Sequence, residues 1–160
     1  MFSLLNRSTS PTDLLSSKLF SEETFYDTFT KDLNGCLHEV IIESPFITNC
    51  RLWQLFPVFK KLKERKVRVI INTRDPHEHD DLYKRDEAHH AIAELQLIGV
   101  QVVYIEGHHR KLAIIDRQIL YEGSLNILSQ KQSREVMRRI VSPELAWQMA
   151  RFVGVDKFLN

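Results

Sequence analysis

The sequence predicts an α/β fold in which a mixed β-sheet carries helices on both faces. Short β-branched runs alternate with helical stretches of ten or more residues, which is typical of helices packed on a sheet. Two late strands flank the tight Asp116-Arg117 turn, and this hairpin makes the sheet mixed rather than purely parallel. No linker divides the 160 residues, so we expect one domain over 1–160. The expected strands are 39–46, 67–72, 100–105, 111–115 and 118–121.

Capping residues and helix breakers place the expected helices. Ser10 and Pro11 are typical of the cap and first residue of a helix, so residues 1–20 are expected to contribute a peripheral N-terminal helix. Pro57 is expected to break the second long helical stretch, because a proline ring clashes with the preceding helical turn. The other helices are expected at 21–35, 57–65, 81–98 and from Ser142 onward.

The composition, with 43% hydrophobic and 27% charged residues, is that of an ordinary globular protein. The formal net charge of +1 gives no global positive field, although a groove on a neutral protein can still be basic. Cys36 and Cys50 are too few for a disulfide framework or a structural zinc site, and we expect both to be reduced. No run approaches the roughly 18 apolar residues of a membrane span, and no signal peptide is visible. We therefore expect a cytoplasmic protein without stable membrane association.

The residues that carry chemistry gather between His108 and Glu135. His109 and Lys111 lie at the start of an expected strand, where alternate side chains project to the same side. Such a pair suits a phosphate group: the imidazole attacks or protonates, and the ammonium neutralises charge on the non-bridging oxygens. Gly123-Ser124-x-Asn126 follows at a turn, where glycine allows close backbone approach and the hydroxyl and amide can donate hydrogen bonds to an anion.

Together these residues resemble the signature of the phospholipase D superfamily. His109-x-Lys111, four residues, Asp116, six residues and Gly123-Ser124-x-Asn126 match that signature at each position. Ser44-Pro45-Phe46-Ile47-Thr48 and Thr73-Arg74, each after an expected strand, are similar to the phospholipase-D-like domains found alone or fused to bacterial helicases and restriction nucleases. The resemblance implies a phospholipase-D-like fold of the small nuclease type, and it adds Arg74 to the candidate substrate-binding residues.

The resemblance also implies a mechanism. Family members use two His-x-Lys motifs: one histidine attacks phosphorus, the other protonates the leaving oxygen, and water then hydrolyses the phosphohistidine. This sequence carries one copy, so a two-fold homodimer is implied, with His109 of each subunit facing the other across the interface. Lys111 and Asn126 of both chains would bind the phosphate oxygens, with Ser124 assisting. No metal and no cofactor are implied, since paired lysines neutralise the charge.

Other residues allow more than one interpretation. The resemblance places Glu135 where related nucleases hold a carboxylate that orients the catalytic histidine, but it could equally be an exposed strand carboxylate. Asp116 belongs to the catalytic motif, yet the family pattern makes it more structural than a direct participant, and it could simply cap its turn. His108 points away from His109 and is expected to be structural. The polar stretch 77–81 contains residue types that bind metals, but it lacks the fixed spacing of a helical zinc site. We expect a solvated loop that borders the substrate groove.

Three functions compete. A nuclease acting on DNA or RNA would have a basic groove and salt-sensitive binding. A phospholipid-hydrolysing phospholipase D would need an exposed apolar rim. A non-catalytic nucleic-acid-binding module attached to a helicase would not need His109, Lys111, Ser124 and Asn126 together. We therefore predict a metal-independent endonuclease that acts as a homodimer on nucleic acid, with a helicase or another DNA-processing protein as a candidate partner.

Overall fold

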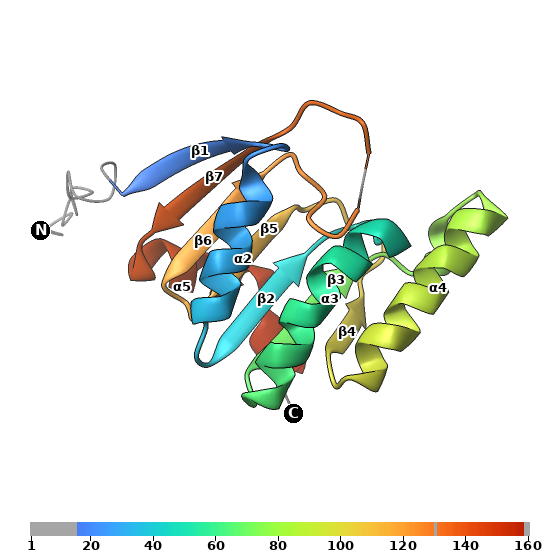
Figure 1. Cartoon of the computed structure of the whole chain (residues 1–160), viewed down its shortest axis with the longest axis horizontal. Coiled ribbons are helices and arrows are strands. Elements are labelled where there is room, and N and C mark those ends of the chain that lie inside the picture. Colours follow the sequence, from blue (N-terminus) through green and yellow to red (C-terminus); the bar gives the residue numbers. More distant parts are fainter. Residues whose placement is uncertain (1–15, 130, 159–160) are drawn as a thin grey trace, which may run out of the picture.

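The computed structural model describes residues 16–129 and 131–158 (Figure 1). These residues form a seven-stranded sheet in the order β1-β7-β6-β5-β2-β3-β4. β2, β3 and β4 run parallel to one another, and every other neighbouring pair is antiparallel, so the predicted mixed sheet is confirmed. The strands are β1 (Ser17–Ser21), β2 (Glu39–Glu43), β3 (Arg68–Thr73), β4 (Gln101–Tyr104), β5 (Leu112–Ile115), β6 (Ile119–Gly123) and β7 (Val136–Val141).

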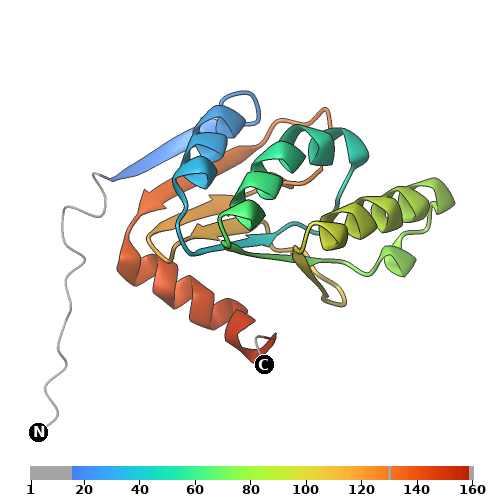
Figure 2. The same cartoon turned by 60° about the horizontal axis from the view of Figure 1, so that its bottom comes forward.

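Helices cover both faces of this sheet, as predicted. α2, α3 and α4 lie on one face, and α5 lies alone on the other (Figure 2). None of the described helices is both long and apolar enough to cross a membrane. The α-helices are α2 (Phe25–Gly35), α3 (Asn49–Glu64), α4 (Leu82–Leu97) and α5 (Pro143–Val153), and the short 3₁₀ helices are η1 (Pro76–Glu78) and η2 (Val155–Phe158).

Alternation along the central strands gives the protein two cores. Ile42 and Ile71 face α2, α3 and α4, whereas their neighbours Ile41 and Ile70 face α5. Tyr121 is fully buried in the larger core. Because successive strand residues point to opposite faces, the apolar runs Val40–Ile42 of β2 and Val69–Ile71 of β3 cover both sides of the sheet.

Two expectations for the chain differ from the structure. Most of the N-terminal helix expected at 1–20 lies outside the described residues, and Ser17–Ser21 form the edge strand β1, paired antiparallel with β7. Pro57 does not break its helix: α3 runs through it from Asn49 to Glu64. Pro57 is exposed, so water can replace the hydrogen bond that its missing N–H cannot make, and the buried residues on either side of it hold both halves of α3 on the sheet.

The sheet topology brings several strand ends to one edge. β5 is antiparallel to β2, with Leu112 opposite Glu43, so β5 begins where β2 ends. β6 ends, and β7 begins, at the same edge, where Gly123 pairs with Met137. The segments that follow β2, β3 and β6 and precede β5 and β7 are therefore neighbours in space, and this edge carries the candidate site.

Candidate functional site

The structure brings together His109 and Arg74, two of the predicted site residues. His109 is exposed just before β5, and its Nε2 lies 2.9 Å from a terminal nitrogen of Arg74. A guanidinium only donates hydrogen bonds, so this contact is a hydrogen bond when Nε2 accepts, which is the case in the tautomer with its proton on Nδ1. In that tautomer Nε2 carries the lone pair that a nucleophile requires.

Arg74 is held in this position from two sides. Its Nε lies 3.8 Å from Glu78 Oε2, and its guanidinium carbon lies 5.5 Å from the centre of the Phe46 ring. Glu78 Oε2 also accepts a hydrogen bond of 3.2 Å from the backbone N–H of Gly107. One carboxylate therefore fixes both Arg74 and the turn that leads into His109.

Lys111 joins the two halves of the motif. Its half-buried side chain donates from Nζ to the backbone oxygen of His109 at 2.9 Å, and its own carbonyl accepts from Gly123 N–H at 3.3 Å. Gly123 is needed here for packing: a Cβ at this position would lie 2.1 Å from the backbone oxygen of Val136. The absence of a side chain at Gly123 thus lets β7 lie close to β6 while Gly123 stays hydrogen-bonded to Lys111.

Ser124 and Asn126 lie in the loop after β6, at the same edge of the sheet. Ser124 Oγ accepts the N–H of Val136 at 3.1 Å, so its hydroxyl proton remains able to donate. Asn126 Oδ1 is buried and has no hydrogen-bond partner among the described residues. The loop docks on the segment after β2, where Leu128 N–H donates to Ser44 Oγ at 3.1 Å.

A buried carboxylate that the sequence analysis missed lies beneath the motif. Glu43 is fully buried at the end of β2 and accepts from Arg110 Nε at 2.5 Å and from Asn72 Nδ2 at 2.9 Å. His108 Nε2 lies 4.0 Å from the same carboxylate. Burial lowers the pKa of His108, and the Glu43 charge only partly offsets this effect, so the His108 imidazole is neutral. Arg110, which follows His109, is thereby fixed to Glu43, and His108, which precedes it, is buried beside the same carboxylate. A glutamate inside an otherwise apolar strand was the signal that could have revealed this network.

Asp116 requires a correction. It follows β5 and therefore lies at the opposite end of that strand from His109. Its carboxylate accepts the backbone N–H groups of Leu37, His38 and Glu39 at 2.8, 2.7 and 2.9 Å. Burial raises the pKa of the Asp116 carboxyl, but these N–H groups outweigh it and leave the pKa below its ordinary value. Asp116 is structural: it fastens the β5–β6 turn to the start of β2 and takes no direct part in a site at His109.

The structure does not join Glu135 to His109. Glu135 Oε1 accepts from Ser133 Oγ at 2.7 Å, and its backbone N–H donates to Glu22 Oε2 at 2.8 Å. No hydrogen bond links Glu135 with His109 in residues 16–129 and 131–158. The contact that orients His109 within one chain is the one with Arg74.

The stretch expected to be a solvated loop at 77–81 is more ordered than that. Residues 76–78 form η1, and His79 is buried with its ring centre 5.3 Å from that of Phe46. Burial lowers the pKa of His79, and the charge of Arg74 lowers it further. No group of three or more histidines, cysteines or acidic residues is placed to hold a metal ion in the described part of the chain.

A model of a known protein family matches most of this chain. The family model described as "Cardiolipin synthase, PLD-like domain" matches residues 29–154, which include every residue of the site. No curated protein sequence matches this chain significantly.

Solved structures share the fold. Nuc from Salmonella typhimurium, a phospholipase D family member, is 14% identical over 86% of this chain and 90% of its own, with a TM-score of 0.70. NucT from Helicobacter pylori is 18% identical over 85% of this chain and 91% of its own, with a TM-score of 0.67. A phosphatidylserine synthase from Haemophilus influenzae is 12% identical over 88% of this chain and 36% of its own, with a TM-score of 0.68. At these identities the likeness shows the fold.

Proposed function

This chain belongs to the phospholipase D superfamily, and from that premise we propose that it hydrolyses phosphodiester bonds of nucleic acids without a metal. The observation that carries the proposal is the exposed His109 imidazole, whose Nε2 lies 2.9 Å from a terminal nitrogen of Arg74. A neutral imidazole beside fixed cations is suited to attack on phosphorus, because the cations bind the oxygens that would otherwise repel the nucleophile.

The reaction has two displacements. His109 Nε2 attacks phosphorus as the P–O bond to the leaving group breaks, and the leaving oxygen takes a proton from the imidazolium of the partner subunit's His109. Water then attacks phosphorus as the P–N bond breaks, and its proton goes to the partner's His109. His109 is left as a free imidazole and the partner's His109 as an imidazolium, as they were at the start. Each histidine thus acts once as acid or nucleophile and the sum is hydrolysis.

The positive charge comes from side chains of the site. When a phosphate enters, its oxygens are better acceptors for the Arg74 guanidinium than a neutral imidazole is, because hydrogen bonds between charged groups are stronger. Arg74 then releases Nε2 for attack and, with Lys111, neutralises the charge that develops on the non-bridging oxygens. Ser124 Oγ and the amide of Asn126 add neutral donors to the same phosphate.

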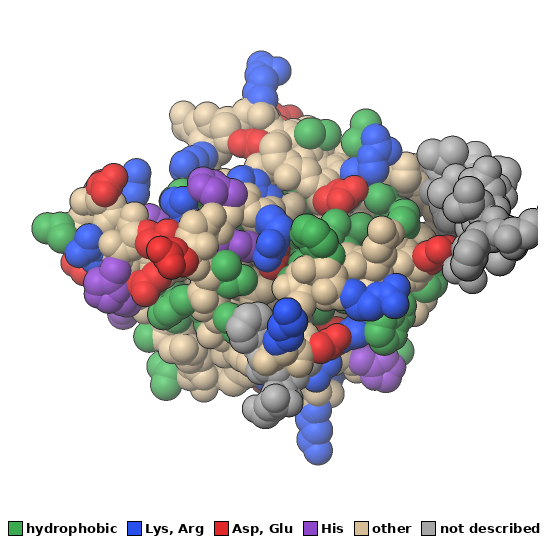
Figure 3. Space-filling view, turned by 180° about the vertical axis from the view of Figure 1, so that it is seen from behind, with side chains coloured by type: hydrophobic (Ala, Val, Ile, Leu, Met, Phe, Trp, Pro, Cys, Tyr) green, Lys and Arg blue, Asp and Glu red, His purple; other side chains and the backbone are tan. Residues whose placement is uncertain are grey.

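A second copy of the chain supplies the second histidine. The face that carries α5 supports this proposal, because Leu19, Trp147 and Phe152 are exposed there at 56%, 46% and 73%. Figure 3 views this face and shows hydrophobic side chains at the surface among charged ones. A groove of about 680 Å³ runs over this face from Lys111 to Phe152. An apolar surface continuous with a site that lacks one catalytic group is well suited to an isologous dimer interface.

Cleavage in excess EDTA tests the proposal. Labelled single- and double-stranded DNA and RNA are incubated with the wild-type protein, with His109→Ala and with His90→Ala, an exposed histidine on α4 as the matched control. We expect the wild type and His90→Ala to cleave and His109→Ala to be inactive while it stays folded by circular dichroism. Cleavage by His109→Ala at the wild-type rate would show that His109 is not the nucleophile. Cleavage of phospholipids alone would assign the site to lipids, and binding without any cleavage would make the chain a binding module.

A further inference from the structure

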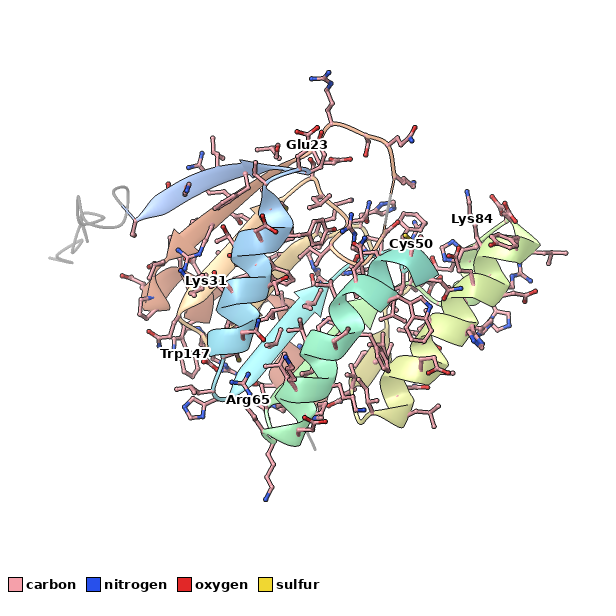
Figure 4. The ribbon with its side chains drawn as sticks, viewed as in Figure 1. Glu23, Lys31, Cys50, Arg65, Lys84 and Trp147 are labelled. Carbon is pink, nitrogen blue, oxygen red and sulfur yellow. The ribbon has the colours of Figure 1, made fainter. Side chains whose placement is uncertain are left out.

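A cavity of about 560 Å³ lies beside the candidate site, and nothing in the proposed chemistry uses it. It opens between the segment after β2, the first turn of α4 and the loop after β6. Figure 4 shows Cys50 at the start of α3 and Lys84 at the start of α4, at the same end of the molecule, and both line the cavity. Its volume falls within the roughly 300–1,000 Å³ that is usual for small-ligand pockets.

The lining combines aromatic rings with cations. Phe46, His79 and Tyr83 supply the rings, and Tyr83 is 75% exposed at the mouth. Lys84 and Lys131 supply the positive charge, and Lys131 Nζ lies 4.8 Å from the centre of the Phe46 ring. Glu87 also lines the cavity, but its Oε1 accepts the backbone N–H of Asn49 at 2.8 Å. Because the Glu87 carboxylate is already hydrogen-bonded, the rings and the two lysines dominate the lining of the cavity. Such a lining favours an anionic ligand with a flat, apolar part.

A polar atom inside the cavity lacks a partner. Ser129 lines it with only 4% of its surface exposed, and within the described ranges its Oγ makes no hydrogen bond. Buried hydroxyls are almost always paired, so an unpaired one in a cavity wall indicates a ligand with polar groups on its edge.

The cavity is one side chain away from the catalytic histidine. The Arg74 guanidinium lies 2.9 Å from His109 Nε2 on one side and 5.5 Å from the Phe46 ring centre on the other. If a substrate phosphate lies at His109, a group of the same substrate that occupies the cavity must therefore be the group directly next to that phosphate.

We propose that this cavity binds an unpaired nucleobase next to the scissile phosphate, which makes single-stranded nucleic acid the preferred substrate. A base has an apolar face for Phe46 and Tyr83 and a polar edge for Ser129 Oγ. One phosphate beside it is the scissile one at His109, and Lys84 and Lys131 are available to the phosphate on its other side. A base within a duplex is stacked and paired, so it would first have to leave the helix before it could enter the cavity. The inference rests on the proposed function and specifies the substrate of that same site.

Cys50 provides a direct readout in the full chain with His109→Ala, which is expected to bind oligonucleotides without cleaving them. The sequence has two cysteines, and Cys36 is buried, with its pKa raised to about 12 by burial and by the nearby Asp116 carboxylate. Iodoacetamide reacts with thiolates, so alkylation reports on the exposed Cys50 at the cavity mouth. The ligands are a short oligodeoxythymidine, its duplex with oligodeoxyadenosine, and an abasic deoxyribose phosphate chain of the same length and charge.

We expect saturating oligodeoxythymidine to slow alkylation of Cys50 by about tenfold, with much weaker protection by the duplex and the abasic chain. Equal protection by the abasic chain would show that only phosphates bind, and equal protection by the duplex would remove the strand preference. Protection by phosphatidylglycerol vesicles but not by the oligonucleotide would assign the cavity to lipid. Each of these results overturns the proposal.

Variants separate the cavity from the catalytic chemistry. In a His109→Ala background that cannot cleave, Tyr83→Ala should weaken oligodeoxythymidine binding about tenfold and Ser129→Ala about fivefold, measured by fluorescence anisotropy. Leu97→Ala is the control, because Leu97 is 79% exposed at the far end of the same helix as Tyr83. Unchanged affinity in both cavity variants would refute the base pocket.

Failure of the proposed function would be visible separately. With His109 restored, Tyr83→Ala and Ser129→Ala should cleave the abasic chain at the wild-type rate, because that substrate has no base to place in the cavity. If the wild-type protein cleaves neither chain, the proposed function fails, and the binding results still decide the cavity.

Discussion

Replacing Asp116 by asparagine should destabilise the fold without removing a catalytic group. The carboxylate accepts backbone N–H groups of Leu37, His38 and Glu39 at 2.7–2.9 Å. Asparagine has the same size and tolerates the left-handed backbone at this position, where φ is 51°. It presents one acceptor oxygen and turns an NH₂ group toward backbone donors, so at least one of these hydrogen bonds is lost and the others lose their charge assistance.

The magnitude follows from the exposure of the three donors. Hydrogen bonds to a charged group contribute roughly 1.5–3 kcal/mol each, and an unpaired buried donor costs a similar amount. The N–H groups of Leu37 and His38 lie in exposed contacts that water can replace, whereas that of Glu39 is partly buried. We therefore expect Asp116→Asn to lose about 2–4 kcal/mol of unfolding free energy, which for a chain of this size lowers the melting temperature by roughly 5–15 °C.

Thermal unfolding followed by far-UV circular dichroism measures this loss. Asp27→Asn, a change at an exposed aspartate on α2, is the matched control and should stay within about 0.5 kcal/mol of the wild type. The folded pKa of Asp116 lies below its unfolded value of about 3.9. The stability gap between wild type and Asp116→Asn should therefore be full above about pH 4 and close as the pH falls through the lowered pKa. A variant with the wild-type melting temperature but no cleavage would refute the structural role.

Three further substitutions test other parts of the account. Gly123→Ala should cost about 3 kcal/mol or more in urea denaturation, because the added methyl group would lie 2.1 Å from Val136 O; Gly35→Ala, which has no atom within 4 Å of a new Cβ, is its control. Glu43→Ala should cost about 3 kcal/mol in the same assay, because it strips a buried carboxylate from its arginine partner, and a neutral effect would contradict the anchoring role. Phe152→Glu should halve the mass in light scattering from near twice 18.8 kDa and abolish cleavage, and an intact dimer would show that the interface lies elsewhere.

The sequence predicted the central part of the fold well. The β-branched runs of β2 and β3 are buried on both faces, so hydrophobicity alone located them, and Ser142 and Asp81 cap α5 and α4 as their residue types suggest. The sequence did not predict β1 and β7 at the edge of the sheet, because apolar and polar residues alternate only weakly along these two strands. Arg139 interrupts the apolar alternation of β7, because its guanidinium forms a bidentate ion pair with Asp32, a contact between residues far apart in the sequence.

The candidate site was also predicted only in part from the sequence. The motif located His109 and Lys111, and the structure places them where the strand ends converge. The expected strand 111–115 already separates Asp116 from His109, but the motif could not show what the Asp116 carboxylate binds. Its partners Leu37, His38 and Glu39 come from a distant part of the sequence. The Glu43 network and the cavity beside Phe46 arise from segments that meet only in the folded chain, so no local pattern encodes them.

The stereochemical course at phosphorus tests the central claim most directly. A phosphodiester substrate that carries one chiral phosphorothioate linkage is cleaved in ¹⁸O-labelled water, and the configuration of the thiophosphate product is determined. Attack by His109 followed by attack of water makes two in-line displacements, each of which inverts phosphorus, so the account predicts net retention of configuration. Net inversion would mean that water attacks phosphorus directly, and the phosphohistidine mechanism would then be wrong.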